Sequence, residues 1–176
     1  MAPATHEFSG QEMNNADSKT LDSVILDVAK IEAPLHIHDL AQRVAARWGH
    51  AQVGTRIMEA IKKRLQWLDS QSSLSVRNNF VYLVGSNSEI KVRSRLGTGI
   101  PAERIALEEY TGAVLSVLST GQAFSRDELI KRVRGRFGYS RTGNQIKQQV
   151  GAAIDLLLRE DKIGEGSTGI RLRVND

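Results

Sequence analysis

Basic side chains gather in one stretch of the chain, between residues 126 and 147. Cations at such density can bind the phosphates of a nucleic acid, and these contacts give affinity that does not depend on base sequence. A solvated face that binds nothing is the competing interpretation. The stretch carries a charge of +5 within 22 residues, with Arg126, Lys131, Arg132, Arg134, Arg136, Arg141 and Lys147 set against Asp127 and Glu128.

Amide side chains follow the basic stretch. If Ile146, Val150 and Ile154 face inward on a helix, the outward positions are Arg141, Asn144, Gln145, Gln148, Gly151 and Ala152. Asn and Gln can contact adenine through two hydrogen bonds, and small residues would allow close approach to a groove. The pattern indicates a base-reading face, although amide-rich faces also occur on helices without a ligand.

Signatures of catalysis and of metal binding were sought and not found. The sequence has no phosphate-binding G-x-x-x-x-G-K-[ST] loop, no G-x-S-x-G elbow, no H-E-x-x-H and no cysteine. His36 and His38 could share a metal, but no third ligand lies nearby, and His38 or Asp39 is better explained as a helix cap. We therefore expect no enzyme activity, no cofactor and no metal.

The elements that must position these residues occur twice. The chain matches itself without gaps when it is shifted by 89 residues, so that Leu40 falls on Leu129, Gly49 on Gly138, and Ile57 on Ile146. Each copy predicts three amphipathic helices, with a short extended segment before the second, and then a hairpin. The first hairpin turns at Asn78-Asn79, since Asn tolerates positive φ. In the first copy, Pro34 ends the first helix.

This order of elements is typical of the winged-helix variant of the helix-turn-helix. The predicted fold class is mainly α with small β-hairpins, in two tandem winged-helix units. The predicted organisation is a disordered segment at 1–20, a first unit at 21–84, a linker at 85–103 and a second unit at 104–176.

In a winged helix the third helix enters the major groove and the hairpin contacts the backbone. The candidate DNA-binding residues of the second unit are Arg132, Arg136, Arg141, Asn144, Gln145, Lys147 and Gln148, with Arg171 and Arg173 on its hairpin. Those of the first unit are Arg56, Lys62, Lys63 and Arg77. Glu59 matches Gln148 and would repel phosphates, so we expect the first unit to bind DNA more weakly.

Three stretches resemble a bacterial domain of unknown function that sits at the C-terminal end of large superfamily I helicase-like proteins. They are APLHIHDLAQRVAARWG with VGTRIMEAI, GTGIPAERIALEEYTGAVLSVL, and FSRDELIKRVRGRFGYSRTGNQI. The resemblance covers roughly residues 22–174 and implies an accessory module beside nucleic-acid motors. The chain departs from that context because it has no ATP-binding segment of its own.

Composition is consistent with these expectations. The 176 residues carry 24 Lys+Arg against 20 Asp+Glu, and 40% are hydrophobic, which is enough for a packed core. No apolar run is long enough to span a membrane, and no signal peptide is evident, so we expect a cytoplasmic protein.

The predicted function is non-catalytic binding of double-stranded DNA, in the service of a helicase or nuclease protein. The alternative is a winged-helix adaptor that binds another protein and does not contact DNA. Self-association is compatible with either prediction.

Overall fold

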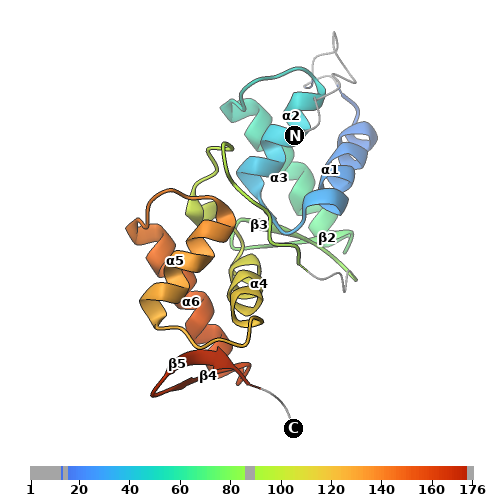
Figure 1. The fold of residues 1–176 in the computed structure, drawn as a ribbon. Coiled ribbons are helices and arrows are strands. Elements are labelled where there is room, and N and C mark those ends of the chain that lie inside the picture. The colour runs from blue at the N-terminus through green and yellow to red at the C-terminus, as the bar shows by residue number, and fades with distance from the viewer. Residues whose placement is uncertain (1–12, 14–15, 86–89, 174–176) are drawn as a thin grey trace. The chain divides into compact units, whose positions relative to one another are not determined.

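The computed structural model describes residues 13, 16–85 and 90–173. It divides into two compact units, residues 1–87 and 88–176. Each unit contains three helices followed by a β-hairpin (Figure 1). The chain is thus mainly helical with small antiparallel hairpins, which confirms this part of the predicted fold class.

The first unit begins with a long helix and ends with a hairpin. Its elements are α1 (Ser18–Glu32), β1 (Leu35–His36), α2 (Ile37–Arg47), α3 (Thr55–Ser70), β2 (Leu74–Arg77) and β3 (Phe80–Leu83). The strands form one antiparallel sheet in the order β1-β3-β2. As predicted, Asn78 and Asn79 form the hairpin turn, with φ of 50° and 64°.

The second unit repeats this order. Its elements are the 3-10 turn η2 (Ala102–Arg104), α4 (Leu107–Leu118), α5 (Arg126–Phe137), α6 (Asn144–Arg159), β4 (Ile163–Gly166) and β5 (Gly169–Leu172). In place of a counterpart to β1, Phe124 forms an isolated antiparallel bridge with Ile170 of β5.

The predicted repeat is confirmed by the element boundaries. Adding 89 to the bounds of α3, β2 and β3 gives those of α6, β4 and β5 with no residue of difference. The match extends ahead of the first helices, because Met13 corresponds to Ala102 and both residues are buried. Ala16 N–H donates to Met13 O, as Ile105 N–H donates to Ala102 O, each at 3.2 Å. The repeated unit therefore begins before residues 21 and 104.

Each unit has its own hydrophobic core. In the second unit, Val114 of α4, Val133 of α5 and Val150 of α6 are fully buried and belong to one cluster. In the first unit, Ile25, Val44 and Ile61 hold the equivalent helix positions and are also fully buried. Apolar side chains at a spacing of three to four residues thus produce the same three-helix core twice.

The helix ends follow local capping chemistry with one departure from expectation. Asp17 caps α1 by accepting from Thr20 N–H at 2.9 Å, and this hydrogen bond lowers the pKa of the Asp17 carboxyl group. Helix α2 is capped by His36, whose Nδ1 accepts from His38 N–H at 3.2 Å. The prediction that His38 or Asp39 caps this helix is therefore wrong, since the Asp39 side chain is buried inside the first turn.

Two predicted segments differ from the structure. Much of the expected linker at 85–103 is packed on the second unit: Val92 contacts its core, and Arg95 N–H donates to Phe137 O at 2.7 Å. Of the segment expected to be disordered at 1–20, Met13 is buried in the first core and α1 begins at Ser18. The rest of that prediction, at residues 1–12, 14 and 15, lies outside the described residues.

Within the described part of the chain, no helix combines the length and the apolar character needed to cross a lipid bilayer.

Candidate nucleic-acid interface

The turn between α5 and α6 is built by local sequence. Ser125 caps the start of α5 by accepting from Glu128 N–H at 3.3 Å. Gly138 ends the helix with φ of 81°, a left-handed conformation that favours glycine. Arg134 then donates to the backbone oxygen of Ser140 at 3.0 Å, which holds the turn against α5. Helix α6 follows Gly143 directly.

Helix α6 presents polar side chains to solvent at its N-terminal end. Buried Ile146, Val150 and Ile154 fix its inner side. Five predicted residues are exposed here and are called the α6 face: Arg141, Asn144, Gln145, Lys147 and Gln148. Neither the Arg141 guanidinium nor the Lys147 amine has a hydrogen bond or ion pair to another described residue. Both cations can therefore bind an external anion without breaking an internal contact.

The α6 face ends at an ion pair. Arg126 of α5 contacts the carboxylate of Asp155, which lies two helical turns after Gln148, and also donates to Gly151 O at 3.2 Å. The guanidinium stands 3.9 Å from where a Cβ of residue 151 would lie. Arg126 therefore lies beside Gly151, and close approach at Gly151 stays a prediction.

Arg132 and Arg136 lie elsewhere on the second unit. They line a hollow of about 300 Å³, called the α5 groove, whose other lining residues are Val117, Thr120 and Gly135. These residues come from α4, the turn that follows it, and α5. Arg132 also pairs with Glu128 at 2.9 Å, and its guanidinium stacks over the Phe124 ring at 4.3 Å.

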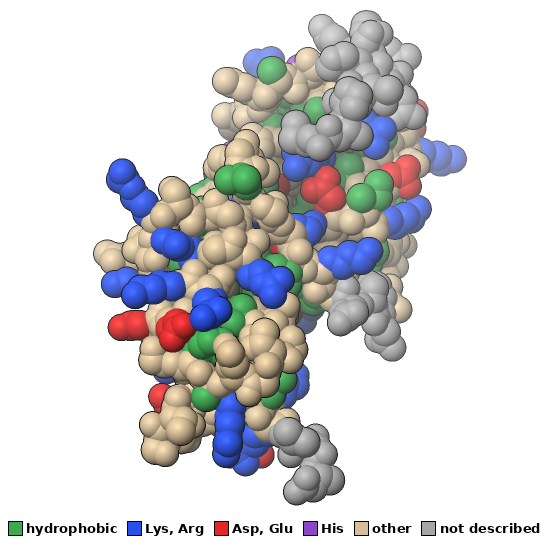
Figure 2. All heavy atoms as spheres, in the orientation of Figure 1, with side chains coloured by type: hydrophobic (Ala, Val, Ile, Leu, Met, Phe, Trp, Pro, Cys, Tyr) green, Lys and Arg blue, Asp and Glu red, His purple; other side chains and the backbone are tan. Residues whose placement is uncertain are grey.

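The predicted basic stretch therefore does not act as one surface. Arg141 and Lys147 belong to the α6 face, and Arg132 and Arg136 line the α5 groove. Arg126 and Arg134 are engaged with Asp155 and Ser140. Figure 2 shows Lys and Arg side chains over α5, with few acids among them.

The hairpin arginines are exposed, as the alternation of β5 predicts. Arg171 pairs with Gly164 in the β4–β5 ladder, but its guanidinium has no partner among the described residues, whereas that of Arg173 pairs with Asp161 at 3.1 Å. Both line a hollow of about 700 Å³ between the hairpin and the end of α4.

The first unit presents a different surface on α3. Arg56, Lys62 and Lys63 are exposed there, and so is Glu59 between them. Arg77 stacks over the Tyr82 ring at 4.3 Å. The surface of α3 therefore carries both acidic and basic side chains, whereas the α6 face carries no acidic side chain.

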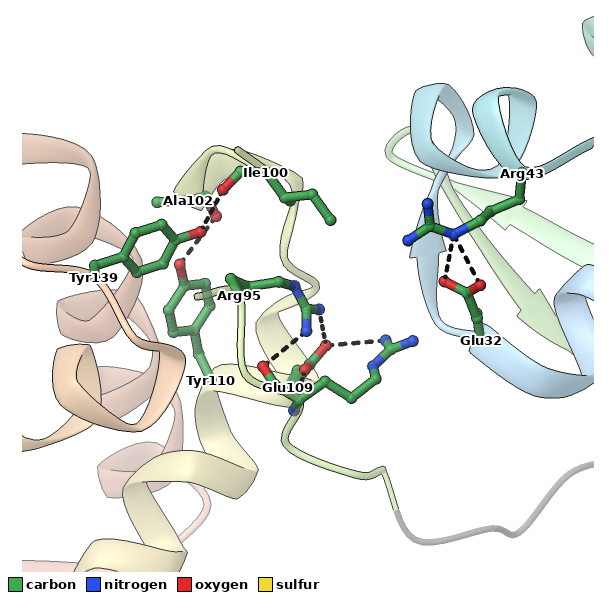
Figure 3. Close-up of polar contacts among 9 residues, drawn as sticks. Glu32, Arg43, Arg95, Ile100, Ala102, Glu109, Tyr110 and Tyr139 are labelled. Carbon is green, nitrogen blue, oxygen red and sulfur yellow. Dashed lines mark hydrogen bonds and ion pairs between the residues drawn. The ribbon is translucent and has the colours of Figure 1, made fainter. Parts of the chain in front are cut away.

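Sequence reasoning missed a buried ion-pair cluster in the second unit. Glu109 lies in the first turn of α4, where a carboxylate is ordinarily solvated, yet its side chain is 0% exposed. It accepts from Arg93 N–H at 2.8 Å and from the Arg93 and Arg95 guanidinium groups at 3.1 and 2.9 Å (Figure 3). Arg93 and Arg95 lie 16 and 14 residues away from Glu109, in the segment expected to be a linker, so no helical or strand periodicity signals the contact.

Two tyrosines fix the same segment to the second unit. Tyr110 donates to Ala102 O at 3.0 Å, and Tyr139 donates to Ile100 O at 2.7 Å (Figure 3). Burial raises the pKa of the Tyr110 hydroxyl well above its usual range, so it stays a donor at neutral pH. In the first unit, Figure 3 shows the Arg43–Glu32 ion pair, which joins α2 to α1 at 3.0 Å.

No group of three or more His, Asp or Glu side chains that could hold a metal occurs within the ranges that the structure describes. The His36 side chain instead caps α2 by accepting from the backbone N–H of His38.

Comparison with known proteins gives one family match. A family model described as "Protein of unknown function (DUF3320)" matches residues 13–59. The matched stretch starts at the buried Met13 and runs through α1, β1 and α2 into α3 of the first unit. A search of curated proteins found no match.

Proposed function

We propose that each unit is a winged helix and that the chain is a tandem winged-helix protein. The order of helix, short strand, two helices and hairpin supports this proposal for the first unit. In the second unit the Phe124–Ile170 bridge takes the place of the short strand. A winged helix would present α3 and α6 as the helices available to a groove.

We further propose that the protein binds double-stranded DNA without catalysing a reaction. The α6 face is the observation that supports this function best. Its amides at Asn144, Gln145 and Gln148 suit base edges, while Arg141 and Lys147 suit the flanking phosphates. Helix-turn-helix proteins read bases with the N-terminal residues of their recognition helix, which corresponds to α6 here.

The second unit supplies most of the affinity in this proposal. Glu59 lies on α3 at the position of Gln148, where its carboxylate repels phosphates. The first unit then adds weaker contacts through Arg56, Lys62 and Lys63. The resemblance to helicase-associated domains extends the proposal to a cytoplasmic accessory of a helicase or nuclease.

Charge reversal on the α6 face tests the proposal. We expect Arg141→Glu with Lys147→Glu to abolish binding to a labelled duplex in fluorescence anisotropy, because two phosphate contacts become repulsive. The matched control is Lys19→Glu with Lys91→Glu, which changes the net charge equally at two exposed cations outside the candidate interface. Equal losses in both double variants would show that only net charge matters and would refute the interface.

The α5 groove supports a second candidate, an adaptor that binds an acidic protein segment. Arg132 and Arg136 face α4 residues there instead of joining the α6 face. If the protein is a DNA-binding one, Arg132→Glu with Arg136→Glu weakens duplex binding less than the α6 double variant. If it is an adaptor only, wild-type protein shows no duplex affinity that depends on salt.

A further inference from the structure

An exposed leucine is held on a tightly braced loop of the second unit. The segment 95–100, called the Leu96 loop, carries a Leu96 side chain that is 76% exposed. Exposed large apolar side chains are few among the described residues: Ile31 is 75% exposed, and Val84 and Trp67 are 54% and 47% exposed. The significance of Leu96 comes from the fixed position of the loop, because a contact group that is already held in place loses little entropy on binding.

The base of the loop is fixed by the buried Glu109 cluster. The Arg95 guanidinium pairs with Glu109 and also donates to Arg93 O at 2.8 Å. Within the loop, the backbone N–H and the hydroxyl of Thr98 both donate to Arg95 O, at 3.1 and 2.7 Å. A buried ion pair is a poor source of net stability, so its clearest consequence here is a defined loop conformation.

The loop lies beside the turn that leads into α6. The Leu96 Cβ stands 2.9 Å from where a Cβ of Gly138 would lie, so the two backbones approach closely. Tyr139 donates to Ile100 O at 2.7 Å at the other end of the loop. Arg141 of the α6 face follows two residues after Tyr139.

The brace belongs to the second copy alone. The positions 89 residues before Arg93, Arg95 and Glu109 hold Ala4, His6 and Thr20, which cannot form the same ion pairs. Leu96 itself corresponds to Glu7. The second unit thus carries both the α6 face and the Leu96 loop.

We infer that the Leu96 loop is a second contact element for the DNA duplex, and this inference rests on the proposed function. Leu96 packs against deoxyribose of the backbone strand whose phosphates Arg141 binds. The contact is apolar, so it adds affinity without releasing counterions. Preorganisation by Glu109 and Tyr139 lowers the entropy that the loop loses on binding.

Leu96→Ser tests the inference, with Ile31→Ser as the matched control because Ile31 is 75% exposed in the first unit. We expect Leu96→Ser to weaken duplex binding about fivefold, the effect of leaving about 40 Å² of apolar surface in water. The slope of log affinity against log salt should stay at its wild-type value. Ile31→Ser should bind like wild type, and both variants should unfold at the wild-type temperature, since both side chains are exposed.

The result separates this inference from the function beneath it. If Leu96→Ser binds like wild type while Arg141→Glu with Lys147→Glu does not bind, the Leu96 contact is refuted and DNA binding stands. If neither variant changes binding, both proposals fall. A loss in Leu96→Ser that comes with a flatter salt slope would also overturn the inference, because it would mean displaced phosphate contacts. Tyr139→Phe, which releases Ile100, should give a smaller loss in the same direction.

Discussion

The ion pair at the end of the α6 face gives a prediction with an unusual sign. Asp155 places a carboxylate on α6 two turns after Gln148 and holds the Arg126 guanidinium. Beside a bound duplex, this carboxylate would repel the phosphates, and it also keeps the Arg126 guanidinium from binding one of them. Asp155→Asn removes the repulsion and frees Arg126 to bind a phosphate. We therefore expect the substitution to strengthen DNA binding.

The magnitude follows from counterion release. One added phosphate contact steepens the slope of log affinity against log salt by about 0.9, so the advantage of Asp155→Asn shrinks about 3.5-fold between 50 and 200 mM salt. The cost to folding is small, because the two side chains are 39% and 57% exposed and such pairs contribute about 0–1 kcal/mol. A gain in affinity should thus come without a large change in the free energy of unfolding.

The assay is anisotropy of a labelled duplex at several salt concentrations. Asp27→Asn is the matched control, since Asp27 forms an exposed pair with Lys30 at 3.1 Å on α1. Arg126→Gln is the reciprocal variant, and it should weaken binding because Asp155 then stands unneutralised. If Asp155→Asn binds no tighter than Asp27→Asn at 50 mM salt, the placement of α6 in the groove is wrong.

Three further predictions concern the elements that hold the interface. Gly138→Ala should destabilise the second unit by about 1–3 kcal/mol in urea unfolding, because φ is 81° and the new Cβ would meet Leu96 at 2.9 Å. Gly169→Ala should cost about as much or more and should open the hairpin, because its Cβ would stand 2.6 Å from Phe124 O; an unchanged midpoint would contradict the close approach. Tyr110→Phe should lower the free energy of unfolding by about 1–3 kcal/mol, since it leaves a buried carbonyl without its donor; calorimetry with no shift would show that water replaces the hydroxyl.

Local pattern was enough to predict the scaffold. The stripe of Ile146, Val150, Ile154 and Leu157 predicts α6, and all four side chains are buried. The shift of 89 residues predicts that the two copies share their elements, which the bounds of α3 and α6 confirm. Periodicity succeeds here because each helix buries one face against two neighbours in a small core.

Nonlocal contacts were beyond the reach of the sequence. Glu109 reads as a first-turn acid, and only the folded chain brings Arg95 to it across 14 residues. A helical wheel places Arg132 on the outside of α5 but does not say which neighbouring element it faces. In the structure Arg132 and Arg136 line the α5 groove together with Val117 and Thr120, so they do not belong to the α6 face.

The two copies together separate what the scaffold needs from what a surface could bind. Val44 and Val133 match at a shift of 89 residues, as do Leu40 and Leu129, and all four side chains are fully buried. Positions that match and differ in charge include Glu59 against Gln148 and Thr20 against Glu109. The shared core does not require these differences, because α3 and α6 keep the same bounds and a three-helix core forms with either residue. They change what the third helix and the Leu96 loop present to solvent in the second unit, and this is why binding is assigned to that unit.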